Sequence, residues 1–307
     1  MAKIINLAPL QKLASPGAPT VTPGGMLAPT SGAVAAQGTT GAATCSYKLV
    51  SVAASGARSL ATANVTVANA NATQTSLNKN HITWVDDPAA ATIEVYRTVG
   101  GADQGYIGSV LVGVQTFDDT GIARAVSPIL PVATTRKYKI VALGTDGRRA
   151  VAGAEGTSAV GPETITAATP MTVDWTASTD AQGYEVWRTD TLVAKGLLGE
   201  TTSAVTIYSD IGAAGDGATA PSVDETGISE PVSTLPYDAK SIQVGGTFVG
   251  TYQVQGTING TDWVDEGAAF TAIGTIDVAH TWSLMRVKNS AFTSGAATAH
   301  LAGRQIT

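Results

Sequence analysis

Three observations on the sequence predict an all-β protein. Its 307 residues include 34 Gly and 13 Pro, and only 14% of them are charged. Thr, Val and Ala alternate in short runs, and Gly, Asn and Asp interrupt these runs as they do in the tight turns between strands. A tandem repeat of fixed period then sets the size of the units into which the strands are grouped.

The repeat has a period of 91 residues and runs without an insertion. The positions that recur are Tyr47, Gly56, Trp84, Tyr96, Arg97, Phe117 and Gly121, which match Tyr138, Gly147, Trp175, Trp187, Arg188, Tyr208 and Gly212. Each copy holds about six short strands with a turn signal roughly every ten residues, which is typical of a β-sandwich. Two sandwiches are therefore expected, at residues 44–131 and 132–222.

Residues 1–43 are expected to form an extended Gly/Pro-rich arm, in which charge is almost absent after Lys12. The prolines of this arm include Pro16, Pro19, Pro23 and Pro29. Because proline fixes φ and removes a backbone donor, we expect an extended conformation without regular ladder hydrogen bonds. Such a segment is ordered only against another surface: its own domains, a sister subunit or a larger assembly. A disordered tail is the alternative.

The repeats resemble a known module. The strings "ITWVDDPAAATIEVYRT" and "VDWTASTDAQGYEVWRT", with "YKLVSVAASGARS" and "YKIVALGTDGRRA", resemble fibronectin type III modules over residues 44–222. The strand order is shifted, because each repeat opens with the strands that this family places last. Two arrangements follow: each block closes on itself as a permuted sandwich, which we favour, or strands are exchanged between subunits.

A third unit follows the repeats at residues 237–307, and we expect it to be a small C-terminal β-sandwich. Asn259 and Gly260 stand between two alternating runs, which predicts a hairpin with a type I′ turn. The strings "SIQVGGTF", "VQGTINGTDWV" and "LMRVKNS" resemble the C-terminal β-domain of tailed-phage virion proteins.

Together, the arm, the fibronectin-like modules and the terminal domain resemble phage structural proteins that decorate capsids or build fibres. The resemblance implies a non-enzymatic capsid decoration, cement or head-fibre protein on the particle surface, made in the host cytoplasm and anchored by its arm and a β-domain. It implies capsid or tail subunits as partners, and further copies of the chain, since trimeric packing is common among such proteins. The alternative is an adhesion module of a tail fibre or baseplate that binds host glycan. Cement action predicts that particles carrying a version truncated before Thr44 lose stability to heat or low salt.

Charge and hydropathy argue against nucleic-acid and membrane partners. The net charge is −6 with scattered Lys and Arg, whereas a nucleic-acid surface needs clustered positive charge. No apolar run approaches the roughly 20 residues that span a bilayer. The N-terminal sequence has one charge and an apolar stretch interrupted by Asn6 and Pro9, so it makes a poor signal peptide, which disfavours an accessory region of a secreted enzyme.

The residues predict no catalytic, cofactor or metal site. His81, His280 and His300 lie in different segments, without the spacing that brings ligands to one metal. The single Cys45 excludes an intrachain disulfide and is interpreted as a small buried apolar residue.

Five carboxylates that we expect in loops are candidate Ca²⁺ ligands: Asp86, Asp87, Asp118, Asp119 and Asp216. They lack the alternating pattern of a calcium loop, and the chemistry of turns explains them. Trp263 and Trp282 are the candidates for a sugar-stacking platform, although a core or interface role is favoured for both in so small a domain.

Overall fold

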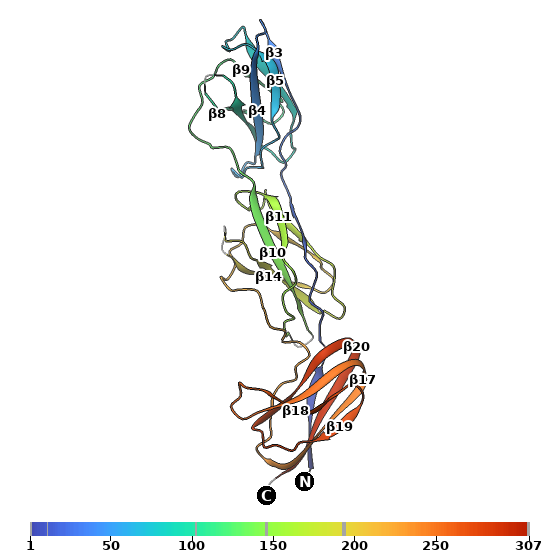
Figure 1. Cartoon of the computed structure of the whole chain (residues 1–307). Helices are drawn as coiled ribbons and strands as arrows, with labels where there is room; N and C mark the ends of the chain where they lie inside the picture. Colours follow the sequence, from blue (N-terminus) through green and yellow to red (C-terminus); the bar gives the residue numbers. More distant parts are fainter. Residues whose placement is uncertain (1, 11, 102, 145–146, 192–194, 306–307) are drawn as a thin grey trace.

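The computed structural model describes residues 2–10, 12–101, 103–144, 147–191 and 195–305. Over these ranges the chain is all-β, with its strands in five antiparallel sheets. None of the described residues belongs to a helix long and apolar enough to cross a membrane. Figure 1 shows three β-sandwiches stacked end to end in a rod, with both termini at the same end. We name them the basal sandwich, at the end with the termini, the middle sandwich and the distal sandwich.

The distal sandwich consists of two facing sheets, with strand orders β5-β4-β7-β8 and β3-β6-β9. Its strands are β3 (Thr30–Gln37), β4 (Ala43–Val52), β5 (Val65–Ala70), β6 (Lys79–Val85), β7 (Thr92–Val99), β8 (Gly105–Leu111) and β9 (Thr116–Asp119). The period-2 alternation turns one row of each sheet inward, so that Leu49, Ile82, Trp84 and Ile93 meet in one buried cluster.

The middle sandwich repeats the distal one, with sheets β11-β10-β13-β14 and β15-β12-β2. Its strands are β2 (Thr20–Pro23), β10 (Thr134–Leu143), β11 (Gly156–Gly161), β12 (Met171–Asp174), β13 (Gly183–Arg188), β14 (Gly196–Thr202) and β15 (Ile207–Asp210). Thr134 opens β10 and Ala43 opens β4, at the 91-residue separation read from the sequence. The strands of each block pair with one another within one chain in the shifted order, and the N-terminal residues add one strand to each block.

The basal sandwich is built around two long strands, β17 (Tyr237–Thr257) and β20 (Leu284–Gln305), which pair along nearly their whole length. Register shifts between Val249 and Gly250 and between Thr251 and Tyr252 bend this ladder, as β-bulges do. Ile242 from one half and Val287 from the other consequently meet in one core. The remaining strands are β1 (Ala2–Leu10), β16 (Val232–Ser233), β18 (Val264–Phe270) and β19 (Gly274–Asp277).

The predicted hairpin turn at Asn259 and Gly260 forms differently. Residues 258–263 make a longer loop between β17 and β18, and of the two turn residues only Gly260 has a positive φ, at 82°. The Asn259 side chain explains this, because its Oδ1 accepts the backbone N–H groups of Thr261 and Asp262 at 3.0 and 2.9 Å. This local side-chain turn replaces the type I′ geometry.

The largest correction concerns the N-terminal residues, which were expected to lack ladder hydrogen bonds. Residues 2–37, which we call the N-terminal strap, instead supply one antiparallel strand to each sandwich. β1 pairs with β20 in the basal sandwich, β2 with β12 in the middle one and β3 with β6 in the distal one. Figure 1 shows the strap, in blue, running from the base of the rod to its far end.

The positions of the prolines explain why they do not prevent pairing. Pro16 and Pro19 lie between β1 and β2, Pro23 ends β2, and Pro29 directly precedes β3. Pro9 lies within β1, where the register shifts between Leu7 and Leu10. Proline is tolerated at edge strands, strand ends and bulges because no ladder donor is needed there. The prolines thus separate three short strands.

Candidate functional site

The strap is bound to the sandwiches by side chains as well as by its ladders. Leu13 and Val21 are buried in the core of the middle sandwich, and Met26 is buried in the core of the distal sandwich. The backbones also approach closely, since a Cβ at Gly156 would lie 2.1 Å from the carbonyl oxygen of Pro19. The strap is therefore an integral part of both cores.

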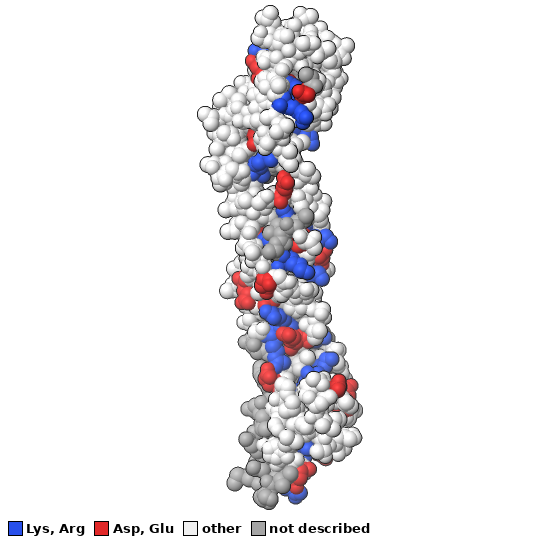
Figure 2. All heavy atoms as spheres, turned by 90° about the vertical axis from the view of Figure 1, so that its left-hand side faces the viewer, with Lys and Arg blue, Asp and Glu red and all other residues white. Residues whose placement is uncertain are grey.

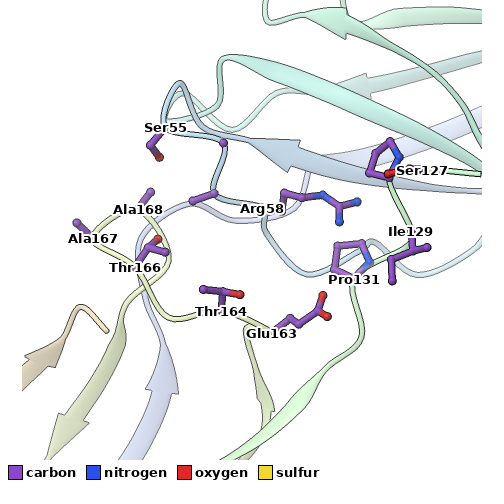
Figure 3. Close-up of a pocket in the computed structure, with 13 residues that line it drawn as sticks. Ser55, Arg58, Ser127, Ile129, Pro131, Glu163, Thr164, Thr166, Ala167 and Ala168 are labelled. Atoms are coloured by element: carbon purple, nitrogen blue, oxygen red, sulfur yellow. The ribbon is translucent and has the colours of Figure 1, made fainter. Parts of the chain in front are cut away.

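A cleft of about 640 Å³ lies between the distal and middle sandwiches. It is lined by the turn at residues 55–58, the linker at 127–131 and the loop at 163–168. In Figure 3, Arg58 projects from the distal side of this cleft and Glu163 from the middle side. These two side chains are the charged groups of the lining.

The cation in the cleft already has a carboxylate partner. Arg58 donates to Glu94 Oε2 from Nε at 2.9 Å and from Nη2 at 2.7 Å, and Tyr96 Oη donates to the same oxygen at 2.7 Å. The pair recurs one repeat later, where Arg149 Nε donates to Glu185 Oε1 at 2.8 Å. This hydrogen bond, together with the Glu185 charge, outweighs burial and raises the pKa of Arg149. Arg58 and Glu94 are thus a repeated element of the scaffold.

Each repeat also holds a buried cluster of Tyr, Asp and Arg. In the distal sandwich Tyr47 Oη donates to Asp119 Oδ2 at 2.7 Å, and Arg97 Nε donates to the same oxygen at 2.8 Å. Burial, and then the charge of Asp119, raise the pKa of Tyr47 far above its ordinary value of 10.0. Because all three side chains are buried, the cluster supports the core and does not present a reactive group to solvent.

The same cluster recurs in the middle sandwich. Tyr138 Oη and Arg188 Nε donate to Asp210 Oδ2 at 2.7 and 2.9 Å. The turn explanation given for Asp119 from sequence was therefore incomplete, since its main partners are Tyr47 and Arg97. The 91-residue register would have found it, because Asp210 lies one period after Asp119.

Each of the other acidic candidates has hydrogen-bond or ion-pair partners within the chain. Asp86 accepts Trp84 Nε1 and the Gly113 N–H at 2.7 and 2.6 Å. Asp87 accepts the Ala89 N–H at 2.7 Å within its own turn. Turn chemistry thus accounts for Asp87, whereas Asp86 joins the indole of Trp84 to a loop 27 residues further along the chain. Asp87 Oδ2 also accepts the Leu27 N–H of the strap at 2.8 Å, a contact that local sequence does not reveal.

Asp118 lies on β9 and not in a loop, so turn chemistry does not explain it, whereas Asp216 has one turn bond, to Ala218, and one more distant bond. Asp118 forms ion pairs with Lys79 and His81. Asp216 Oδ1 accepts the N–H groups of Leu197 and Ala218 at 3.0 and 2.9 Å. Over the ranges that the structure describes, no three His, Cys, Asp or Glu residues gather as a metal site.

The three histidines lie on different elements of the fold. His81 is on β6, His280 lies between β19 and β20, and His300 is on β20. His280 Nδ1 is 2.8 Å from Glu266 Oε2, while Trp282 Nε1 donates to that same oxygen at 2.8 Å. Cys45 is fully buried in the distal core, in keeping with its interpretation as a small apolar residue.

The contacts of Glu266 predict an acid-sensitive basal sandwich. Burial acts to raise the pKa of its carboxyl, but hydrogen bonds from Trp282, the Ala279 N–H and His280 outweigh this and hold the pKa below the usual 4.5. A depressed pKa contributes stability that is present above pH 4.5 and is lost as pH falls through the lower folded value. We expect the unfolding temperature of the basal sandwich to fall over this range, and Glu266→Gln to flatten the dependence in calorimetric scans. An equally steep dependence in Glu266→Gln would show that another carboxylate is responsible.

The two tryptophans of the basal sandwich have different surroundings. Trp282 is partly buried and packs against the basal core, as favoured from sequence. Trp263 is only partly buried and lies outside that core, and the guanidinium carbon of Arg286 sits 4.0 Å from its ring centroid. One face of the indole is therefore covered by a cation, which leaves at most the other face for a sugar.

The distal end of the rod is a cluster of interlocked loops. The Thr39 N–H donates to Asn78 Oδ1 at 2.8 Å, and Gln74 Nε2 donates to the Asn71 carbonyl at 3.0 Å. The loops at residues 38–42 and 71–78 carry no formal charge, and Leu77 is 81% exposed at their surface. Figure 2 shows that, on the face it displays, acidic and basic side chains are interspersed along the rod without a large area of one sign.

Comparison with protein-family models, with curated proteins and with solved structures found no match to this chain. Any functional conclusion therefore rests on the geometry and on the sequence resemblance.

Proposed function

We propose that this chain is a structural rod of a tailed-phage particle, a capsid decoration or head-fibre protein without an enzymatic role. One observation supports this more than any other: the strap pairs with all three sandwiches. Each junction is consequently crossed by two covalent connections, the strap and an interdomain linker. Two connections at each junction suit a protein that holds its far end at a distance from its base.

The geometry suggests which end is attached. Both termini lie at the base, and the distal sandwich forms the opposite end of the rod (Figure 1). Its loops at residues 38–42 and 71–78 carry no formal charge. The strap is engaged by its own sandwiches, so we propose the basal sandwich, in place of a free arm, as the part that contacts capsid or tail subunits. Further copies of the chain are partners in the same proposal.

Localisation in particles tests this proposal. Gold-labelled antibody against the distal sandwich is expected to bind intact particles outside the shell or along the tail. The number of copies of the protein in each particle then distinguishes a capsid location from a tail location, because capsid decoration requires many more copies than a tail structure. Finding the protein only in the unassembled fraction of a lysate, or finding hydrolytic activity in the purified chain, would contradict the proposal.

The distal loops favour a second candidate, an adhesion module that binds host glycan. Uncharged Thr, Asn and Ser side chains around the exposed Leu77 offer hydrogen bonds and an apolar contact to a neutral sugar. Under this candidate, Leu77→Asp reduces attachment of particles that stay intact. Leu111→Asp, at a residue that is 68% exposed outside these loops, is the matched control. Unchanged attachment in Leu77→Asp would remove this candidate and leave the structural role standing.

A further inference from the structure

The two junctions of the rod are built differently, although the sandwiches above and below them are repeats. The junction between the middle and basal sandwiches contains residues 221–230, which we call the basal linker. Its Pro221 carbonyl accepts the Ala152 N–H at 2.9 Å, and its Glu225 N–H donates to the Arg149 carbonyl at 2.8 Å. These bonds tie the linker to the middle sandwich.

The same linker is tied to the basal sandwich. The Asn289 N–H donates to the Gly227 carbonyl at 2.7 Å, and the Ser229 N–H donates to the Val287 carbonyl at 2.9 Å. An isolated bridge between Ile228 and Lys288 lies between these two bonds. The basal linker is therefore bonded to both neighbours through its backbone.

The strap completes this junction. The Leu13 N–H donates to Thr226 Oγ1 at 3.0 Å, and Thr226 is 4% exposed. Lys12 Nζ lies 3.7 Å from Asp224 Oδ2. Arg148, in the turn of the middle sandwich, also forms an ion pair with Glu230. Exposed ion pairs contribute little alone, so the backbone bonds and the buried Thr226 define the junction.

The junction between the distal and middle sandwiches lacks such a bonded linker. The linker there, residues 123–133, is bonded to the distal sandwich, with the Ala125 N–H donating to the Tyr106 carbonyl at 2.9 Å. Within the described ranges, that linker is hydrogen-bonded to the middle sandwich through the Thr134 hydroxyl, which donates to the Val132 carbonyl two residues before it at 3.3 Å. We identify no other hydrogen bond or ion pair in these ranges that joins the linker to the middle sandwich or joins the two sandwiches directly across the cleft. Ala57 occupies the position that lies one repeat before Arg148. The ion pair that Arg148 forms at the junction between the middle and basal sandwiches therefore has no counterpart at the junction between the distal and middle sandwiches.

The strap is hydrogen-bonded to both sandwiches where it crosses this junction. The Gly24 N–H donates to the Pro170 carbonyl of the middle sandwich at 2.8 Å. The Met26 N–H donates to the Ala168 carbonyl of the middle sandwich at 2.9 Å, while the Met26 side chain is buried in the distal core. The next N–H, that of Leu27, donates to Asp87 of the distal sandwich. The strap therefore passes from the middle to the distal sandwich at Met26, with the 640 Å³ cleft beside it.

We propose that the rod bends at the junction between the distal and middle sandwiches, about Met26, by opening and closing the cleft in Figure 3. The middle and basal sandwiches move as one body, because the basal linker joins them. Domains without a large shared interface move relative to one another by default. The basal linker opposes such movement at the middle-to-basal junction, because its backbone is bonded to both neighbours. Among the residues that the structure describes, the linker at residues 123–133 has no such set of backbone bonds to the middle sandwich. The bend lets the distal loops sample orientations while the base stays attached.

Distance measurements between spin labels test this asymmetry on the full chain. Exposed Thr73, Ser203 and Thr271 report on the distal, middle and basal sandwiches, and Cys45 is buried and is expected to stay unlabelled. In double electron–electron resonance, Thr73→Cys with Ser203→Cys is expected to give a distribution roughly twice as wide as Ser203→Cys with Thr271→Cys. Protein without introduced cysteines checks that Cys45 takes no label.

A variant of the fixed junction completes the test. Thr226→Val removes the acceptor of the Leu13 N–H while keeping the side-chain shape, and it is expected to widen the middle-to-basal distribution and leave the distal-to-middle one unchanged. Equal widths at the two junctions in the parent chain, whether narrow or broad, would overturn the proposal. So would a distal-to-middle distribution that is narrower than the middle-to-basal one.

Discussion

Deleting residues 2–37 is expected to destabilise all three sandwiches at once. Each sandwich loses the edge strand that pairs with β6, β12 or β20, and the cores lose Leu13, Val21 and Met26. The exposed ladder edges and apolar gaps then favour aggregation. Calorimetry of residues 38–307 is expected to show loss of cooperative transitions, and a synthetic strap peptide added in trans is expected to restore at least part of them.

A matched pair of point variants tests the contribution of the strap to a core without shortening the chain. Val21 is 7% exposed and faces the core of the middle sandwich, while Thr22, its neighbour in β2, is exposed. Val21→Asp places an unpaired carboxylate in that core and is expected to lower the stability of the middle sandwich by about 3 kcal/mol or more. Thr22→Asp is expected to change it by about 0.5 kcal/mol at most. Equal small effects would mean that β2 is not part of the core.

The strap also changes how a truncation in particles is interpreted. A version that begins at Thr44 lacks a strand of each sandwich, so a loss of particle stability no longer distinguishes anchoring from misfolding. Substitutions on the basal surface are the better test of attachment, because they leave the strap in place.

Removing the carboxylate of Asp119 is the second large effect that we expect. Asp119→Ala leaves the Arg97 guanidinium buried without its partner, which costs about 3–5 kcal/mol in comparable buried pairs. Asp210→Ala is expected to do the same to the middle sandwich, where Arg188 is buried. Denaturant unfolding followed by fluorescence measures both, with Trp84 buried in the distal core and Trp175 in the middle core.

The neighbouring residue supplies the control. The Asp118 side chain is 38% exposed and pairs with Lys79 and His81 at the surface, so Asp118→Ala is expected to cost about 1 kcal/mol or less. A loss for Asp119→Ala no larger than that for Asp118→Ala would contradict the assignment. Replacing Asp119 and Arg97 together by Leu and Met is expected to recover much of the loss, since apolar groups of similar volume often substitute for a buried ion pair.

The 91-residue register predicted much of the fold because it is a global signal. It relates Trp84 to Trp175 and Arg97 to Arg188, and the sheets of the two repeats follow it. The turn of Asn259 was predicted less well, because its side chain competes for backbone N–H groups. Local patterns show that a hairpin forms, and the side chains then select its geometry.

The sequence predicts an extended arm that is ordered against another surface, with the chain's own domains among the candidates, but it does not predict the ladders of the strap. Its strands are short, prolines interrupt them, and their partners lie far along the chain, with Ala2 opposite Arg304 and Thr22 opposite Thr172. Nothing in a local window records a partner at such a distance. The buried Asp119 was misjudged similarly, because its nearest sequence context is a turn and its partners come from β4 and β7.

Hydrogen–deuterium exchange on the intact chain tests the central claim, that the strap is a strand of every sandwich. The amides of β2 and β3 that donate across the ladders to β12 and β6 are expected to exchange as slowly as those partner strands. Protection at both strands, lost locally at β2 in Val21→Asp, is the predicted result. Exchange of residues 20–37 at the rate of an unstructured peptide, with the sandwiches still protected, would contradict the account.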